Sequence, residues 1–255
     1  MNIAADPYPF DFVPECCALL IIDMQRDFLE PGGFGEMLGN DVSQLRRAIE
    51  PNVKLLAAWR AAKLRVIHTR EGHLPDLTDL HASKKNRGSH AMRIGDDGPM
   101  GRILVRGELG HDIIPELYPQ DEEPVVDKPG KGAFHATDLH DLLTDKGIRQ
   151  LVVTGVTTEV CVSTTVREAN DRGYDCLILE DCVASYFPEF HKWSLEMTKA
   201  QGGIFGWVSE SKHLLGALGK WSASVNAPAA AGPDNAENGN VMVNEKGEST
   251  GARIC

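Results

Sequence analysis

Three residues that could support nucleophilic chemistry each follow a short apolar run of the sequence. Asp23 follows ALLII, Lys128 follows EPVVD, and Cys161 follows LVVT after a turn that contains glycine. The carboxyl ends of parallel strands meet at one edge of a sheet, so these side chains can converge. A cysteine nucleophile needs a base or a nearby cation. The pattern therefore predicts Cys161 as nucleophile, Asp23 as proton acceptor and donor, and Lys128 as the stabilising cation.

The surroundings of Cys161 favour the same chemistry. Residues 151–154 are typical of a buried strand, 155–158 of a sharp turn, and a helix is expected to open near Glu159. A cysteine in the first turn of a helix has a lowered pKa, and the free N–H groups there can hold an oxyanion. The alternative is a buried cysteine with a structural role only, since free cysteines are among the most buried residues.

The elements that must position these residues alternate between strand and helix. Further strands are expected at residues 64–69, 123–128 and 175–180, and helices at 42–62, 137–146, 190–199 and 211–218, with Pro51 kinking or splitting the first. The alternation predicts a three-layer α-β-α fold with a doubly wound, mainly parallel sheet. Residues 72–109 are expected to form a long functional loop. We expect an irregular N-terminal arm (1–17), one domain (18–221) and a disordered, low-complexity tail (222–255).

Composition narrows the range of partners. The formal net charge of −11 argues against nucleic acid or an anionic membrane as a partner. There is no apolar run of about 18 residues and no signal-peptide pattern, so we expect a cytoplasmic protein without a membrane contact. The six cysteines lack C-x-x-C spacing and are expected to be reduced.

Other site types fit the sequence poorly. Gly130-Lys131-Gly132 lacks the third glycine of a dinucleotide-binding motif and the Ser or Thr of a P-loop. No G-x-S-x-G serine motif and no H-x-x-x-H metal pair is present. We therefore expect neither a nucleotide nor a serine nucleophile.

Three ordered motifs, IIDMQ, VVDKPGKGAF and TGVTTEVCV, resemble those of the isochorismatase-like cysteine hydrolases over residues 18 to about 220. The resemblance implies hydrolysis of a C–N bond in a small amide or ureido compound. The segments HTREGH, GRILVRGELGHDIIPELYP and QGGIFG are most similar to the biuret amidohydrolases of this family, which implies biuret cleavage to allophanate and ammonia. The open alternatives are ureidoacrylate, triuret or a carbamoylated amine as substrate, and a non-catalytic binding protein.

The same resemblance implies further features of the site. The backbone N–H groups of Thr157 and Cys161 would form the oxyanion hole, and the Val156–Thr157 peptide bond would be cis. Gln201 would contact the substrate amide. Separately from the resemblance, Arg70, Glu71 and Lys131 are expected to contact the substrate because of their loop position and polarity, and Phe28 is a further expected contact. The resemblance implies no metal, no cofactor and a homotetramer in which the N-terminal arm and the glycine-rich loop make contacts.

Overall fold

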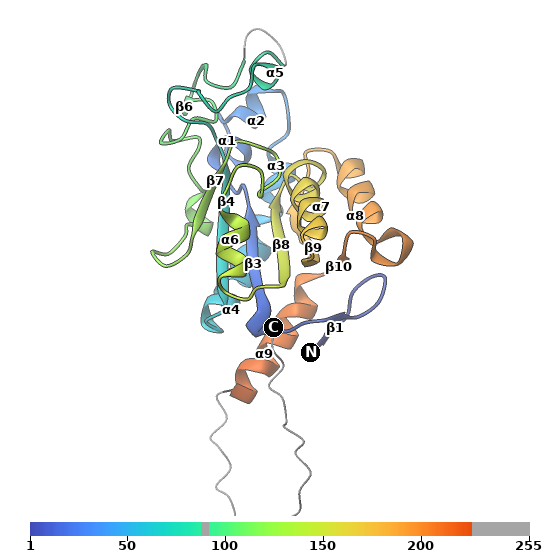
Figure 1. The fold of residues 1–255 in the computed structure, drawn as a ribbon. Helices are drawn as coiled ribbons and strands as arrows, with labels where there is room; N and C mark the ends of the chain where they lie inside the picture. The colour runs from blue at the N-terminus through green and yellow to red at the C-terminus, as the bar shows by residue number, and fades with distance from the viewer. Residues whose placement is uncertain (88–91, 226–255) are drawn as a thin grey trace, which may run out of the picture.

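A six-stranded parallel sheet forms the middle layer of the computed structural model, which describes residues 1–87 and 92–225 (Figure 1). The strand order is β10-β9-β8-β3-β4-β7, and each neighbouring pair is parallel. The chain builds outward from the central pair β3 and β8 in both directions, so the sheet is doubly wound, as predicted. The six strands are β3 (Cys17–Ile22), β4 (Arg65–Glu71), β7 (Val125–Lys128), β8 (Gln150–Val156), β9 (Asp175–Ala184) and β10 (Trp207–Ser209).

The two central strands are buried along their whole length, which explains why their sequences are mostly apolar. Successive β3 side chains point to opposite faces, so Leu19 and Ile21 enter one hydrophobic cluster and Leu20 and Ile22 the other. The first cluster packs against α4 (Ile49–Ala61) and α9 (Ser211–Val225). The second packs against α6 (Leu139–Thr144), α7 (Ser163–Asp171) and α8 (Pro188–Gly203). The fold therefore has the three layers that the sequence predicts.

Short elements complete the described chain. They are the helices α1 (Arg26–Leu29), α2 (Phe34–Met37), α3 (Ser43–Arg46) and α5 (Ala82–Lys85), the 3-10 turns Pro14–Cys16 and Pro115–Leu117, the π-helical turn Thr158–Val162, and the strand pairs β1 (Asn2–Ile3) with β2 (Phe10–Asp11) and β5 (Asp97–Gly98) with β6 (Gly101–Arg102). None of the described helices combines the length and apolar character that crossing a membrane requires.

Several predicted boundaries differ in the structure. The helix predicted over 42–62 is split after Arg46, and Pro51 lies in the first turn of α4, where its missing N–H costs no hydrogen bond. Strand β4 continues to Glu71, so two residues expected beyond the strand belong to it. Strand β9 likewise continues to Ala184.

The two ends of the chain also differ from expectation. The N-terminal arm is not irregular throughout, because Ile3, Phe10 and Phe12 are buried in the first cluster and β1 pairs with β2. Helix α9 runs past the predicted domain boundary at 221, and the rest of the predicted tail, 226–255, lies outside the described residues. Cys16 is disulfide-bonded, so the expectation of reduced thiols is wrong for that residue. The free thiols among the described residues are Cys17, Cys161, Cys176 and Cys182.

Gly155 permits the close approach of β8 to β3 beside the ends of both strands. Its φ is +103°, a conformation that L side chains rarely adopt, and a Cβ atom there would overlap the backbone of Ile22. Gly155 is paired with Ile22 in the sheet register, one residue before Asp23. The glycine therefore fixes the distance between the end of β3 and the turn that leads to Cys161.

We predict that Gly155→Ala lowers the free energy of unfolding by about 3 kcal/mol, because the new methyl group meets the backbone of β3 at a strained φ. Urea denaturation followed by circular dichroism measures the loss. Gly216→Ala in α9 is the matched control, since no atom lies within 4 Å of the added Cβ. Equal denaturation midpoints for Gly155→Ala and the unmodified protein would contradict this role.

Candidate active site

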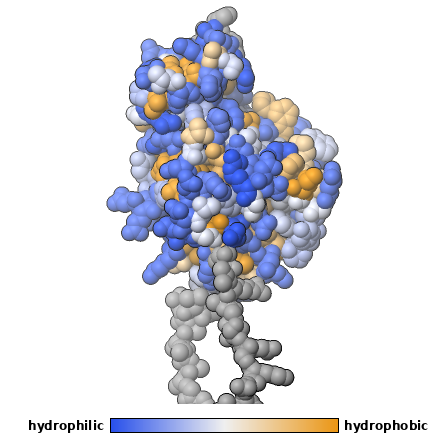
Figure 2. Space-filling model, viewed as in Figure 1, coloured by the Kyte–Doolittle hydropathy of each residue, from blue (hydrophilic) through white to orange (hydrophobic). Residues whose placement is uncertain are grey.

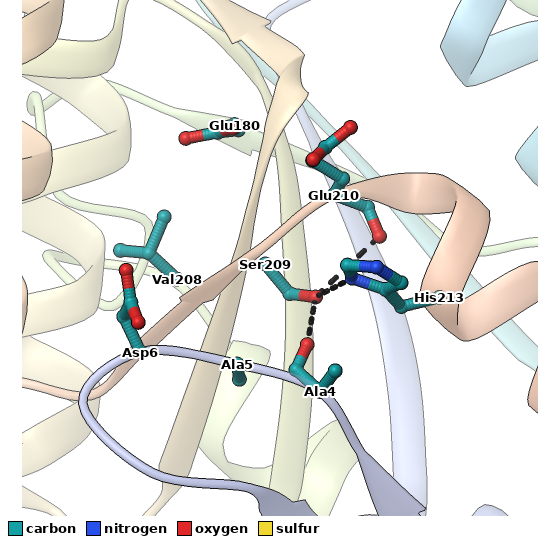
Figure 3. Close-up of a pocket in the computed structure, with 8 residues that line it drawn as sticks. All are labelled: Ala4, Ala5, Asp6, Glu180, Val208, Ser209, Glu210 and His213. Atoms are coloured by element: carbon teal, nitrogen blue, oxygen red, sulfur yellow. Dashed lines mark hydrogen bonds between the residues drawn. The ribbon is translucent and has the colours of Figure 1, made fainter.

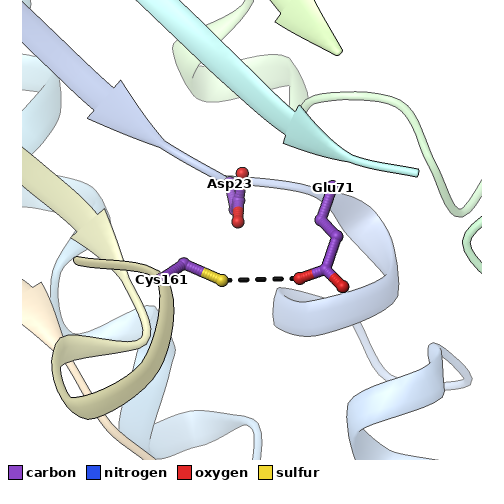
Figure 4. A group of neighbouring side chains, drawn as sticks. All are labelled: Asp23, Glu71 and Cys161. Carbon is purple, nitrogen blue, oxygen red and sulfur yellow. Dashed lines mark hydrogen bonds between the residues drawn. The ribbon is translucent and has the colours of Figure 1, made fainter. Parts of the chain in front are cut away.

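Four neighbouring strands bring four functional side chains together at one edge of the sheet. Asp23 follows β3, Glu71 ends β4, Lys128 ends β7, and Cys161 lies in the turn after β8. The register pairs Glu71 with Lys128 across β4 and β7. Figure 4 shows the side chains of Asp23, Glu71 and Cys161 facing one another. The three residues of the predicted catalytic set therefore converge, and Glu71 joins them.

Lys128 is the buried cation of this cluster. Its Nζ lies 2.7 Å from Asp23 Oδ2 and 3.9 Å from Glu71 Oε2, and both Lys128 and Asp23 are fully buried. The ammonium also donates to the carbonyls of Gly130 and Lys131. Burial alone would lower the pKa of Lys128, but the neighbouring acidic groups outweigh burial and raise it. Lys128 therefore stays positively charged.

Asp23 is held from two sides. Thr69 Oγ1 donates to Asp23 Oδ1 at 2.6 Å, while Lys128 pairs with the other oxygen. The backbone N–H of Asp23 donates to the carbonyl of Thr69 at 3.2 Å, and Asp23 has a φ of +51°. This left-handed turn directs the chain out of β3 and leaves the carboxylate beside the thiol.

Cys161 Sγ donates to Glu71 Oε2 at 3.4 Å inside the buried cluster. Burial raises the pKa of the thiol well above its ordinary range, Lys128 opposes this rise, and Asp23 and Glu71 add to it. The expectation of a lowered pKa at a helix N-terminus is therefore wrong. The first turn is π-helical rather than α-helical, and burial among carboxylates outweighs the effect of the helix end.

Three ammonium groups keep Glu71 ionised. Burial would raise its pKa, but the ammonium groups of Lys128, Lys131 and Lys84 lower it to about 2. Lys131 and Lys84 donate to Oε1 at 2.7 and 2.8 Å, which leaves Oε2 for the thiol. The amide side chain of Gln25 clamps the backbone of Glu71 by accepting from its N–H and donating to its carbonyl.

The turn before Cys161 presents backbone N–H groups. The Val156–Thr157 peptide bond is cis, and no backbone carbonyl of the described residues accepts from Thr157 N–H. Thr158 Oγ1 lies 2.9 Å from His191 Nδ1 on α8, which anchors the turn from the second face of the sheet. Preorganised N–H groups of this kind can stabilise a developing oxyanion.

The other predicted substrate contacts are placed differently. Arg70 pairs with Asp127 and Asp112 and, one residue before Glu71, points to the opposite face of the sheet. Lys131 is brought to the cluster, where its ammonium pairs with the Glu71 carboxylate. Phe28 lies on α1, partly buried against the first core cluster. Gln201 is exposed at the end of α8, beside the start of β10, at the opposite end of the sheet from Cys161. Within one chain, Gln201 is not brought to the cluster.

The cluster also resembles a metal-binding set. Ligand atoms of Asp23, Glu71 and Cys161 all lie within 4.8 Å of one another, and no second such group occurs in residues 1–87 and 92–225. However, the ammonium groups of Lys128, Lys131 and Lys84 already face the two carboxylates. A divalent ion would be repelled by three adjacent positive charges, so the donor set does not fit one.

A hollow of about 260 Å³ lies away from this cluster, between the N-terminal arm and β10 (Figure 3). Three carboxylates, those of Asp6, Glu180 and Glu210, line it together with His213 and small residues. Ser209 Oγ donates to the carbonyl of Ala4 across its floor. None of the four clustered residues lines this hollow, so it is not part of the candidate active site.

Two partners of the cluster were not predicted. Lys84 comes from the long segment 72–109, which has no periodic pattern that would indicate where it docks. Gln25 lies within the IIDMQ motif, and its position two residues after Asp23 was the available signal.

The chain is similar to hydrolases of known sequence and structure. The isochorismatase domain matches residues 17–212. Ureidoacrylate amidohydrolase RutB from Pantoea ananatis is 33% identical over 226 residues, which cover 85% of this chain and 88% of that protein. RutB from Yersinia enterocolitica is 32% identical over 215 residues, covering 82% and 92%. A cysteine hydrolase from Pseudomonas syringae pv. phaseolicola superposes with a TM-score of 0.71 at 25% identity, covering 86% of this chain and 98% of that chain.

The raised pKa of Cys161 predicts how the thiol reacts with iodoacetamide. Only the thiolate reacts, so the rate should rise about tenfold per pH unit from pH 7 to 9 without levelling off. Mass spectrometry of the peptide that contains Cys161 measures the rate, and Cys161→Ala is the control for the assignment. A plateau below pH 8 would show a thiolate of low pKa and contradict the burial argument.

Proposed function

Because the chain belongs to the isochorismatase family and is a hydrolase of amide C–N bonds, we propose that it cleaves a terminal ureido group with Cys161 as nucleophile. The observation that carries this proposal is the contact of the buried Cys161 thiol with Glu71, beside the ion pair of Asp23 and Lys128. A scaffold protein has no need for this arrangement of buried charge. The family membership sets aside the alternative of a non-catalytic binding protein.

In the first step, Cys161 Sγ attacks the ureido carbonyl carbon. An S–C bond forms, the carbonyl π electrons move to oxygen, and the thiol proton moves to Asp23. Asp23 faces one ammonium group whereas Glu71 faces three, so less positive charge opposes the arrival of a proton at Asp23. The N–H groups of Thr157 and Cys161 stabilise the oxyanion.

The tetrahedral intermediate then collapses and its C–N bond breaks. Asp23 returns the proton to the leaving nitrogen, and ammonia departs, which leaves a thioester-like carbamoyl group on Cys161. Water attacks this group while Asp23 takes a proton from the water. The C–S bond breaks, the thiol regains its proton, and the product carries a carboxylate.

The relatives favour ureidoacrylate as the substrate, because both curated proteins are named ureidoacrylate amidohydrolases. Biuret is the second candidate, favoured by the HTREGH and DKPGKGAF segments that contain Glu71 and Lys131. The cluster offers a physical distinction between them. Three ammonium groups face two carboxylates, so one positive charge is unbalanced while the thiol is neutral. Ureidoacrylate would bring a carboxylate to that charge, whereas neutral biuret would leave it for the oxyanion.

Ammonia release from ureidoacrylate, biuret and triuret, measured in parallel, tests the proposed activity. We expect turnover of at least one of them, and none by Cys161→Ala. Cys176→Ala, which removes another buried free thiol, is the matched control and should remain active. Turnover by Cys161→Ala, or no ammonia from any of the three substrates, would contradict the proposal.

Asp23→Asn tests the proton transfer separately. The amide has a similar shape but cannot carry the proton, so we expect kcat to fall by at least about 100-fold with a smaller change in KM. Steady-state kinetics on the best substrate measure both constants. Near-normal kcat in Asp23→Asn would remove Asp23 from the mechanism.

A homotetramer, implied by the family resemblance, is part of this proposal. Helix α8 exposes large apolar side chains, with Phe190, Trp193 and Met197 exposed to 52%, 58% and 49%. Figure 2 shows hydrophobic side chains at the right of the view, where Figure 1 has α8. Such patches mark contact surfaces. Gln201, at the opposite sheet end, reaches a substrate only if a second copy brings it there.

Light scattering after size-exclusion chromatography tests this assembly. We expect the mass of four chains, and a smaller mass for Trp193→Glu because the charge would be buried in the contact. A monomeric unmodified protein would contradict the proposed tetramer.

A further inference from the structure

Helix α5 turns part of the long 72–109 segment toward the catalytic cluster. Its two lysines differ in environment: the Lys84 side chain is only 18% exposed, whereas Lys85 is exposed to solvent. A lysine is rarely buried without a partner, because removing its charge from water costs several kcal/mol. The burial of Lys84 therefore indicates specific partners.

All three donors of the Lys84 ammonium have partners. Nζ lies 2.8 Å from Glu71 Oε1, 2.6 Å from the carbonyl of Pro129 and 2.9 Å from His73 Nε2. Burial and the Lys84 charge lower the pKa of His73, so its ring is neutral near pH 7 and Nε2 can accept. The other ring nitrogen, Nδ1, then carries its proton toward Asp79 Oδ1 at 3.3 Å.

These contacts determine which carboxylate oxygen of Glu71 faces Cys161. Lys84 and Lys131 both bind Oε1, so the carboxylate cannot rotate without breaking two charged hydrogen bonds. Oε2 consequently faces Cys161 Sγ. The contact to Pro129 also ties α5 to the end of β7, next to Lys128.

We propose that Lys84 is a positioning residue that acts on the nucleophile through Glu71, by fixing that carboxylate and offsetting its charge beside the Cys161 thiol. Docking of α5 thus completes the charge balance of the active site. This inference rests on the proposed role of Cys161 as nucleophile, and it does not depend on which substrate is cleaved.

The chemical consequence concerns the thiolate that must form during attack. Without Lys84, the charge of Glu71 would be less offset and would oppose the thiolate more strongly. A nearby charge shifts a pKa by about one unit or more. Because Lys84 acts on the thiol through Glu71, we expect its loss to raise the pKa of Cys161 by about one unit. The pH profile for alkylation of Cys161 should therefore move upward, which loss of a purely structural contact would not cause.

A double-mutant cycle with iodoacetamide tests the proposal on the full-length protein without any substrate. In Lys84→Met, the rate of Cys161 alkylation at pH 8 should fall about tenfold. Glu71→Gln should raise the rate, because a negative charge beside the thiolate is lost. In the Glu71→Gln background, Lys84→Met should change the rate by less than about twofold, since the residue through which Lys84 acts is gone.

Lys85→Met, one residue along the same helix, is the matched control and should leave the rate unchanged. Lys84→Gln keeps a hydrogen-bond donor without the charge, and replaces Lys84→Met if that variant does not fold; it should show the same slow alkylation. The proposal is overturned if the Lys84 variants react at the unmodified rate, or if the two effects add in the double variant. Failure of the ureido assay alone would leave this result unaffected, so the two proposals fail separately.

Discussion

The structure depends on one buried balance of charge at the ends of β3, β4 and β7. Lys128 and the two carboxylates of Asp23 and Glu71 are almost completely removed from water. A single unpaired charge there would destabilise the fold by several kcal/mol, so each needs its partner at hydrogen-bonding distance. Lys128 pairs with Asp23 at 2.7 Å, and Glu71 pairs with Lys131 and Lys84 at 2.7 and 2.8 Å. The parallel register places Glu71 opposite Lys128, 3.9 Å from its ammonium. Gly155 allows β8 to approach β3 closely enough for Cys161 to join them.

This balance explains why Cys161, the proposed nucleophile, rests as a thiol. Burial opposes the thiolate, and the two carboxylates that could take its proton oppose it further. The thiol therefore loses its proton only as the sulfur bonds to a substrate carbonyl carbon and the N–H groups of the turn stabilise the oxyanion. In the proposed mechanism, the cluster favours the transition state over the free thiolate, which is the condition for catalysis by differential binding. It also protects Cys161 from reactions with other electrophiles near neutral pH.

Much of this arrangement could be predicted from the sequence, because Asp23, Lys128 and Cys161 lie at or just beyond the carboxyl ends of predicted parallel strands, which share one edge of the sheet. The three layers and the doubly wound, parallel sheet follow from the same alternation, whereas the strand order was not predicted. The direction of the Cys161 pKa shift could not, since it depends on how deeply the turn is buried and on the position of Glu71. Arg70 and Glu71 were expected to act alike, but extension of β4 by two residues places them on opposite faces. Lys84 was missed because only tertiary packing brings α5 to the site, and Gln201 was expected near a site that lies at the other end of the sheet.

The protonation state of Cys161 in the resting protein tests this account most directly. The Raman spectrum of the unmodified protein minus that of Cys161→Ala isolates the S–H stretching band of this one thiol. We predict that the band is present at pH 7 and persists at pH 9, because burial among carboxylates keeps the proton on sulfur. Absence of the band at pH 7 would mean a resting thiolate, and would contradict the charge balance on which the proposed mechanism rests.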